Sequence, residues 1–297
     1  MTEPTTPAGT APWIDRALYP WDADAFRTPA GTMRYVDAGD GEPVVMIHGN
    51  PTWSFTFRTL ITGLSDTNRC IAPDLLGFGQ SDKPVDWSYT PQDHATMVAM
   101  LLDALDLRDV TLVVHDWGGP IGLSWALVHP ERVKRLVLCN TWLWSVQDVR
   151  YYRMFSGVMG GPAGRALIRH ANLFVRGVVP MAYGDRRKLT PAVKHHLRAP
   201  FATKDSRKGS WVFPGQIIGS SDWLASRWEQ RDRLTGKPAL IAWGMKDIAF
   251  HADSLERWQT LLPAAEVHRL PTTGHFVQDE AGDELLALVR AFLDANP

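Results

Sequence analysis

Three residues that could carry nucleophilic catalysis stand where apolar runs of the sequence end. Asp116 follows TLVVH, Asp247 follows ALIAWGMK, and His275 follows VHRLPTTG. Each one alone has an ordinary explanation, since an aspartate at a strand end caps a helix or forms a turn and most histidines are structural. Together, an attacking carboxylate, a base and a carboxylate that orients the base make a catalytic constellation.

A carboxylate is suited to a different substrate from the one that a serine hydroxyl attacks. It is already ionised at neutral pH, so it needs no base to remove a proton before it attacks. It can therefore displace a leaving group from a saturated carbon, which offers no carbonyl to polarise. We expect Asp116 to form an ester on its own side chain, His275 to activate a water that hydrolyses the ester, and Asp247 to orient His275.

Short apolar strands alternate with helical patterns and predict a parallel sheet with helices on both faces. The expected strands are 32–39, 43–49, 69–73, 110–116, 133–141, 238–247 and 265–275. The expected helices are 54–66, 90–107, 120–133, 254–263 and 283–295, with Thr90 as N-cap and Pro91 at the first helical position of the second one. Because ligands bind beyond the carboxyl ends of parallel strands, the loops that carry Asn50, Asp116, Asp247 and His275 should converge.

The strand–helix alternation stops after about residue 143 and resumes after about residue 228. Between these points the sequence has helical segments, such as 190–201, but no convincing strand. We therefore predict one α/β domain formed by residues 1–142 and 229–297, with a helical cap, residues 143–228, inserted after the sixth strand. The order nucleophile, acid, histidine is that of the α/β-hydrolase fold, so the sheet should have eight mostly parallel strands.

Composition limits the partners and the cellular compartment. The 297 residues have a formal net charge of -1, which gives no reason to expect nucleic acid as a partner. The N-terminal stretch lacks the basic and apolar regions of a signal peptide, and no apolar run approaches the length of a membrane span. Cys70 and Cys139 lie in strand-like segments and are expected to be free buried thiols. We thus expect a cytoplasmic enzyme with no membrane partner.

Several segments resemble the haloalkane dehalogenase family. They are HGNPTWSFTFR (48–58), DLLGFGQSDKP (74–84), HDWGGPIGLSWALVHPERV (115–133) and GHFVQDE (274–280). The resemblance covers roughly residues 15–142 and 229–295 and is weaker across the cap. HDWGG also occurs in epoxide hydrolases, whereas HGNPTWS discriminates between the two families. The resemblance implies hydrolysis of haloalkanes to alcohol, halide and a proton, with neither cofactor nor metal.

The resemblance also implies how the leaving halide is bound. The indole N–H of Trp117 and the side-chain amide of Asn50 would bind the halide, and the backbone N–H groups of the same two residues would form the oxyanion hole. One subfamily places a catalytic glutamate after the sixth strand, but Asn140 stands there, so the acid would be Asp247. This combination resembles the third subfamily, whose members associate into large oligomers, and so implies a homo-oligomer.

Two rival interpretations remain. An epoxide hydrolase uses the same aspartate but needs cap tyrosines to protonate the opening ring, and Tyr151, Tyr152 and Tyr183 lie in the cap region. The second rival interpretation is a non-enzymatic α/β-hydrolase that serves as a small-molecule receptor or scaffold. The complete triad argues against it. Residues 172–180 of the cap and Phe250 are further candidates for the walls of a substrate pocket.

Overall fold

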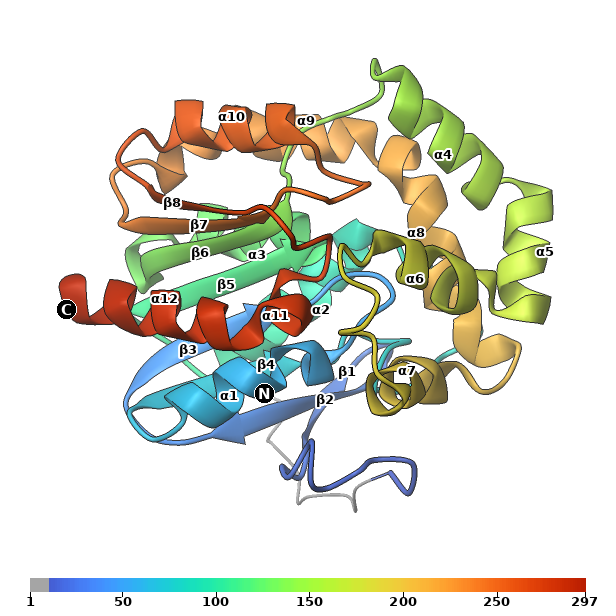
Figure 1. Cartoon of the computed structure of the whole chain (residues 1–297), viewed down its shortest axis with the longest axis horizontal. Helices are drawn as coiled ribbons and strands as arrows, with labels where there is room; N and C mark the ends of the chain where they lie inside the picture. Colours follow the sequence, from blue (N-terminus) through green and yellow to red (C-terminus); the bar gives the residue numbers. More distant parts are fainter. Residues whose placement is uncertain (1–10) are drawn as a thin grey trace.

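An eight-stranded sheet forms the centre of the computed structural model, which describes residues 11–297 (Figure 1). The strand order is β1-β2-β4-β3-β5-β6-β7-β8, with β2 antiparallel to both of its neighbours and all other pairs parallel. The strands are β1 Asp24–Thr28, β2 Gly31–Ala38, β3 Glu42–Ile47, β4 Asn68–Pro73, β5 Val110–Asp116, β6 Val133–Thr141, β7 Ala239–Gly244 and β8 Glu266–Leu270.

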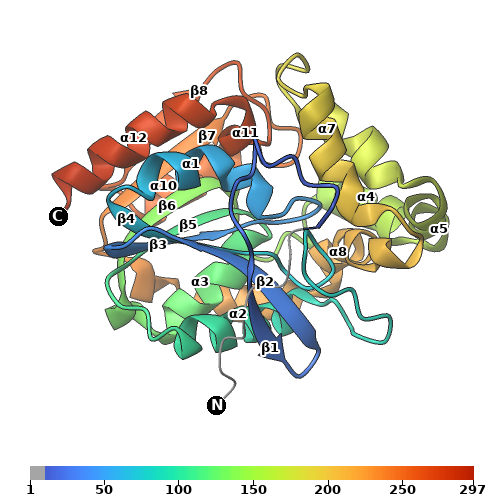
Figure 2. The ribbon, with the colours of Figure 1, turned by 90° about the horizontal axis from the view of Figure 1, so that it is seen from below.

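Helices cover both faces of the sheet. α1 packs with α12 on one face, next to α11, and α2 packs with α3 on the other (Figure 2). The bounds of these helices and of α10 are α1 Arg58–Leu64, α2 Pro91–Ala104, α3 Gly118–Val128, α10 Ala252–Leu261, α11 Val277–Glu280 and α12 Gly282–Ala295. This arrangement confirms the predicted α/β-hydrolase fold with its mostly parallel eight-stranded sheet.

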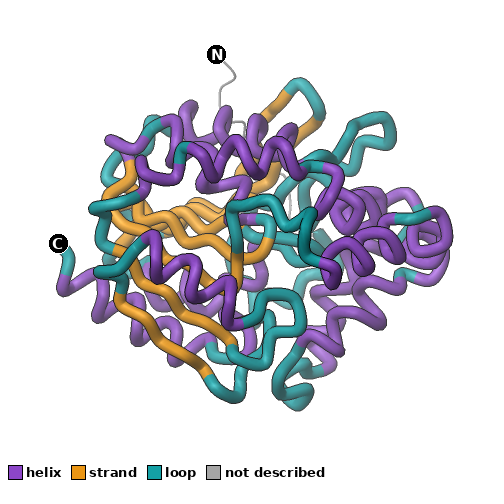
Figure 3. Tube along the Cα trace, turned by 90° about the horizontal axis from the view of Figure 1, so that it is seen from above, coloured by secondary structure: helices purple, strands orange, loops and turns teal. Residues whose placement is uncertain are grey.

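The connection from β6 to β7 is helical, and Figure 3 shows its helices gathered to one side of the sheet. Its helices are α4 Arg150–Gly160, α5 Pro162–Ala171, α6 Val179–Ala182, α7 Pro191–Arg198, α8 Lys208–Gly219 and α9 Ser221–Glu229. Shorter turns of the chain are η1 Ser54–Phe57, η2 Pro130–Arg132, the π-helical η3 Phe174–Val178, η4 Ala199–Phe201, η5 Asp205–Arg207 and η6 Arg231–Leu234. The predicted cap, residues 143–228, takes in α4 to α8 and all but the last residue of α9.

Local sequence explains the elements that carry the site. Every residue of β5 is buried, because helices cover both faces of the central strands, and its sequence is accordingly apolar almost throughout. α2 begins as predicted: the Thr90 side chain accepts the Asp93 N–H and Pro91 occupies the first turn. Cys70 and Cys139 are free and buried, and burial raises the pKa of both thiols to about 12.

The structure departs from the sequence prediction at two places near the sheet. The eighth strand, β1, is absent from the predicted strands. It is a five-residue edge strand with a mixed burial pattern, and its sequence shows no clear strand pattern. The helix predicted over 120–133 instead begins at Gly118 and ends at Val128. Its first residue, Gly118, lies against β3, where a Cβ would come within 1.9 Å of the Ile47 carbonyl oxygen. It stops early because Pro130 disfavours helical backbone at His129.

Candidate active site

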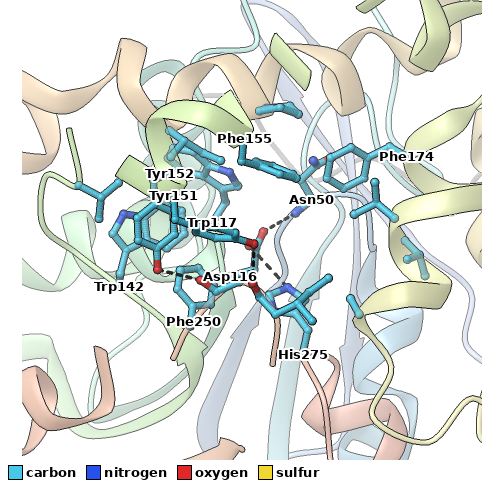
Figure 4. Close-up of a pocket in the computed structure, with 18 of the residues that line it drawn as sticks. Asn50, Asp116, Trp117, Trp142, Tyr151, Tyr152, Phe155, Phe174, Phe250 and His275 are labelled. Carbon is cyan, nitrogen blue, oxygen red and sulfur yellow. Dashed lines mark hydrogen bonds and ion pairs between the residues drawn. The ribbon is translucent and has the colours of Figure 1, made fainter. Parts of the chain in front are cut away.

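The ends of β3, β5, β7 and β8 bring the predicted site residues together. Asn50, Asp116 and His275 line one pocket (Figure 4), and Asp247 contacts the Nδ1 atom of His275. Asp116 is only 9% exposed and Asp247 only 6% exposed. Residues that are up to 225 positions apart therefore meet at the carboxyl edge of the sheet, as the topology requires.

Asp116 occupies a strained turn between β5 and α3. Its φ of 51° lies in the left-handed region, which a non-glycine residue adopts only where its surroundings impose it. The Thr141 hydroxyl donates to the Asp116 carbonyl oxygen at 2.6 Å and holds the turn from β6. Gly49 faces the carboxylate so closely that a Cβ there would lie 2.1 Å from Asp116 Oδ1. The turn thus presents the side chain to the pocket.

The two carboxylate oxygens of Asp116 have different surroundings. Oδ1 accepts the Asn50 backbone N–H at 2.8 Å, and the Trp117 backbone N–H also hydrogen-bonds the carboxylate. Oδ2 faces His275, whose Nε2 is 3.7 Å away. Burial raises the pKa of Asp116 to about 6, although the His275 charge and the two N–H groups oppose the shift. Oδ2 is therefore the oxygen that is free to attack.

His275 is oriented by Asp247. Its Nδ1 lies 2.9 Å from Asp247 Oδ2, so Nδ1 carries the proton and Nε2 presents its lone pair toward Asp116. Burial alone lowers the pKa of His275, but the charge and hydrogen bond of Asp247 outweigh it, and the pKa is raised overall. Its backbone is held from below as well, since the buried His115 donates from Nε2 to the His275 carbonyl oxygen at 2.8 Å.

Asn140 supports Asp247 and was not assigned this role from the sequence. Its side-chain amide donates to Asp247 Oδ2 at 2.7 Å and to the Gly244 carbonyl at 3.1 Å, while its Oδ1 accepts the Gly244 N–H at 2.7 Å. The sequence showed only that no carboxylate follows β6. A polar residue at the end of a central strand was the available signal, because buried amides need partners.

The catalytic loop is also tied to the cap. The buried carboxylate of Glu280 accepts the Gly274 N–H and the Asp185 N–H, each at 2.9 Å. The His275 N–H donates to the Ala182 carbonyl at 2.8 Å. One carboxylate therefore joins the loop that carries the histidine to the cap segment that follows α6.

The pocket has few polar groups and many apolar walls. It encloses roughly 770 Å³ of empty space, open mouth included. Asn50 Oδ1 is buried without a hydrogen-bond partner, and within residues 11–297 no acceptor binds the Trp117 indole N–H. From the cap candidates, Phe174, Val178 and Val179 line the pocket, as does Phe250. An uncharged, apolar molecule with one electronegative leaving group fits these surroundings.

The hydroxyls of the three cap tyrosines all have acceptors within the protein. Tyr151 donates to the Ile248 carbonyl at 2.6 Å and Tyr152 to the Ala249 carbonyl at 2.7 Å, and both side chains line the pocket. The Tyr183 hydroxyl donates to Asp279 at 2.9 Å. A role in protonating the oxygen of an opening epoxide would require a phenol to exchange its present acceptor for the substrate.

The described part of the chain contains no candidate metal site. Among residues 11–297, no three His, Cys, Asp or Glu side chains are grouped so that they could hold a metal ion. The arrangement around Asp116 consists of a buried carboxylate, a histidine that faces it and backbone N–H donors. Such a set can form and hydrolyse an ester on the protein itself.

Comparisons with known proteins place this geometry in context. The alpha/beta hydrolase fold family matches residues 42–282. Haloalkane dehalogenase 2 of Mycobacterium tuberculosis is 36% identical over 277 residues, 93% of this chain and 96% of that protein. A cis-3-alkyl-4-alkyloxetan-2-one decarboxylase of Xanthomonas campestris is 36% identical over 294 residues, 91% of this chain and 94% of that protein. The crystal structure of the haloalkane dehalogenase DatA from Agrobacterium tumefaciens matches with a TM-score of 0.84 at 28% identity, covering 96% of this chain and all of that one.

Replacing the buried amide that supports Asp247 should weaken the fold measurably. Asn140→Ala leaves the Gly244 N–H without its acceptor, so we expect the free energy of unfolding in urea to fall by about 2 kcal/mol. Asn68→Ala is the matched control, because that amide donates to Glu42 at an exposed position and should change stability by less than about 0.5 kcal/mol. Equal effects of the two substitutions would contradict the supporting role of Asn140.

Proposed function

The chain belongs to the haloalkane dehalogenase family of α/β hydrolases, and on that premise we propose that it hydrolyses haloalkanes through a covalent ester of Asp116. The products are an alcohol, a halide ion and a proton. The observation that carries the proposal is the pairing of the buried Asp116 carboxylate with two side-chain groups, the Trp117 indole and the Asn50 amide, in one apolar pocket.

The first step is displacement of the halide. Asp116 Oδ2 attacks the carbon that bears the halogen, a carbon–oxygen bond forms, and the carbon–halogen bond breaks with its electron pair leaving on the halide. The Trp117 indole N–H and the Asn50 amide N–H donate to the departing ion, which is otherwise surrounded by apolar walls. Losing one such aimed donor typically costs about 3 kcal/mol of transition-state stabilisation.

The second step is hydrolysis of the ester. His275 Nε2 takes a proton from water, and the water oxygen adds to the ester carbon of Asp116. The negative charge that develops on Oδ1 is stabilised by the backbone N–H groups of Asn50 and Trp117. When this intermediate collapses, the bond from the carboxyl carbon to the alkyl-bearing oxygen breaks and His275 returns its proton to that oxygen, which leaves as the alcohol. The carboxylic acid that remains on Asp116 loses its proton to solvent and becomes the carboxylate again. Asp247 stabilises the imidazolium while it exists.

A second candidate reaction comes from the relatives. The decarboxylase of Xanthomonas campestris acts, by its name, on a β-lactone, and it is as similar to this chain as the dehalogenase is. A strained lactone also offers a carbon that a carboxylate can attack. Epoxide opening has less support, because the hydroxyls of Tyr151, Tyr152 and Tyr183 donate elsewhere.

A substrate panel separates these reactions. With 1-bromobutane, a cis-3,4-dialkyl β-lactone and styrene oxide offered in parallel, we expect bromide and butanol from the first and little turnover of the other two. The readouts are halide release, alkene with carbon dioxide, and diol. Asp116→Ala should abolish bromide release, since it removes the attacking atom. Alkene formation from the lactone without any bromide release would establish the decarboxylase instead.

Removing the base should trap the ester. In His275→Phe, halide displacement proceeds but water is not activated, so the butyl group stays on Asp116. Peptide mass spectrometry after incubation with 1-bromobutane should find the added butyl mass on the peptide that carries Asp116. His129→Phe, which alters a partly exposed histidine remote from the pocket, should leave that peptide unmodified at steady state. An unmodified Asp116 peptide in His275→Phe would argue against the two-step scheme.

The two steps should respond differently to pH. Displacement needs ionised Asp116, whose pKa is raised to about 6, so the single-turnover rate of halide release should halve near pH 6 and fall tenfold per unit below it. Hydrolysis needs neutral His275, whose pKa is raised above 6.5, so this step should decline first as the pH falls. Quenched-flow measurements near pH 6.5 should show the ester accumulating. If the rate of hydrolysis stayed constant to a lower pH than the rate of displacement, the order of the two pKa values would be the opposite of the one proposed.

A further inference from the structure

Charge is strongly separated between the cap and the rest of the chain. Residues 143–228 contain 14 Lys and Arg against 4 Asp and Glu, a net charge of +10. The remaining residues contain 17 against 28, a net charge of −11. The near-neutral total therefore conceals a basic cap and an acidic core, and a field of this kind favours anionic partners on the cap side.

The basic charge is concentrated on the outermost helices. Residues 149–184 contain five arginines and neither Asp nor Glu. This stretch includes α4 and α5, which form the edge of the molecule farthest from the sheet (Figure 1). The five arginines are Arg150, Arg153, Arg165, Arg169 and Arg176. Within residues 11–297 only Arg169 among them forms an ion pair, an exposed one of 3.0 Å with Asp205.

The same stretch is unusually apolar at its surface. Of the ten large apolar side chains that are exposed among residues 11–297, six lie between 149 and 184. They are Val149, Tyr151, Met154, Val158, Leu167 and Met181. On α4 the exposed positions 150, 151, 153, 154 and 158 follow helical spacing, so arginines and apolar side chains share one face. We call this surface of α4, together with the exposed residues of α5, the α4–α5 face.

The pocket reaches the surface beside this face. Tyr151 and Ile248 both line the pocket, yet they remain 41% and 36% exposed. The Tyr151 hydroxyl donates to the Ile248 carbonyl at 2.6 Å, which joins the two sides of the opening. Residues that line the pocket are therefore exposed at the edge of the α4–α5 face.

We propose that the α4–α5 face docks on the surface of an anionic lipid bilayer. Arginines there interact with lipid headgroups, and the exposed Met154, Val158 and Leu167 enter the boundary of the acyl chains, as in helices that lie at membrane interfaces. Nucleic acid would satisfy the arginines but not these apolar side chains. A second copy of the chain, docked by its acidic core, would cover the opening at Tyr151 and Ile248.

The docking is peripheral rather than transmembrane. None of the helices within residues 11–297 is long and apolar enough to cross a bilayer. If the proposed function holds, docking would also deliver substrate, because apolar haloalkanes concentrate in the lipid next to the docked cap. The binding itself does not depend on which reaction the pocket performs.

Vesicle flotation tests the proposal. The full chain is mixed with vesicles of phosphatidylcholine alone or with 30% phosphatidylglycerol, at 50 mM and 500 mM NaCl. We expect flotation with the anionic vesicles only, and its loss at high salt, because screening weakens headgroup contacts. Arg150→Gln with Arg153→Gln should weaken partitioning about 25-fold, since each basic residue contributes roughly a factor of five. Met154→Ser with Val158→Ser should weaken it at least threefold.

Controls make each outcome decisive. Arg27→Gln with Arg108→Gln removes the same charge from the exposed core and should leave flotation unchanged. All variants should release bromide from water-soluble 2-bromoethanol at the wild-type rate, which verifies their fold. Absence of flotation at 50 mM NaCl, or equal losses in the core and α4 variants, overturns the proposal. Self-association by sedimentation that only the α4 variants abolish, without flotation, would assign the face to contacts between copies. Flotation without bromide release would refute only the proposed function.

Discussion

The buried carboxylate of Asp116 is the constraint on which the rest of the site depends. An ion removed from water is costly by several kcal/mol unless nearby donors or an opposite charge compensate it. Here the compensation comes from the Asn50 and Trp117 N–H groups and from His275. These donors reach the carboxylate only because the backbone of Asp116 adopts a φ of 51° and because Gly49 has no side chain. The strained turn at Asp116 and the close approach of Gly49 thus together allow the buried charge to be stabilised.

The core and the cap divide the work between them. The proposed reacting and positioning groups lie at or just beyond the carboxyl ends of strands of the sheet, whose central strand β5 is buried throughout. The cap supplies walls, among them Phe174 on a π-helical turn, a conformation that often marks functional sites. The sheet thus carries the proposed reacting groups, and the cap carries many of the apolar walls that surround them.

Sequence patterns predicted best where one local rule decides the structure. Thr90 and Pro91 begin a helix by capping chemistry, and the apolar run at the start of β5 is typical of a buried central strand. The strand β1 was not predicted because it is a short edge strand with only two buried residues, so its sequence has no apolar run or regular alternation. The hydrogen bond from Asn140 to Asp247 was not predicted either, because its two residues are 107 positions apart and no local pattern links them. The net charge of -1 could not show that the cap is basic and the rest of the chain acidic, because it is a sum over the whole chain.

The carboxylate of Glu280 has a consequence for how such enzymes can diversify. It accepts N–H groups from both the histidine loop and the segment after α6, so the cap is fastened to the catalytic machinery at a point distant from its two covalent connections. A cap exchanged between relatives would therefore have to keep residues 182–185 compatible with the histidine loop, as well as keeping the other hydrogen bonds that join cap and core, such as those of Tyr151, Tyr152 and His196. An exchange that changes the pocket walls and keeps these contacts would alter substrate range without disturbing the position of His275.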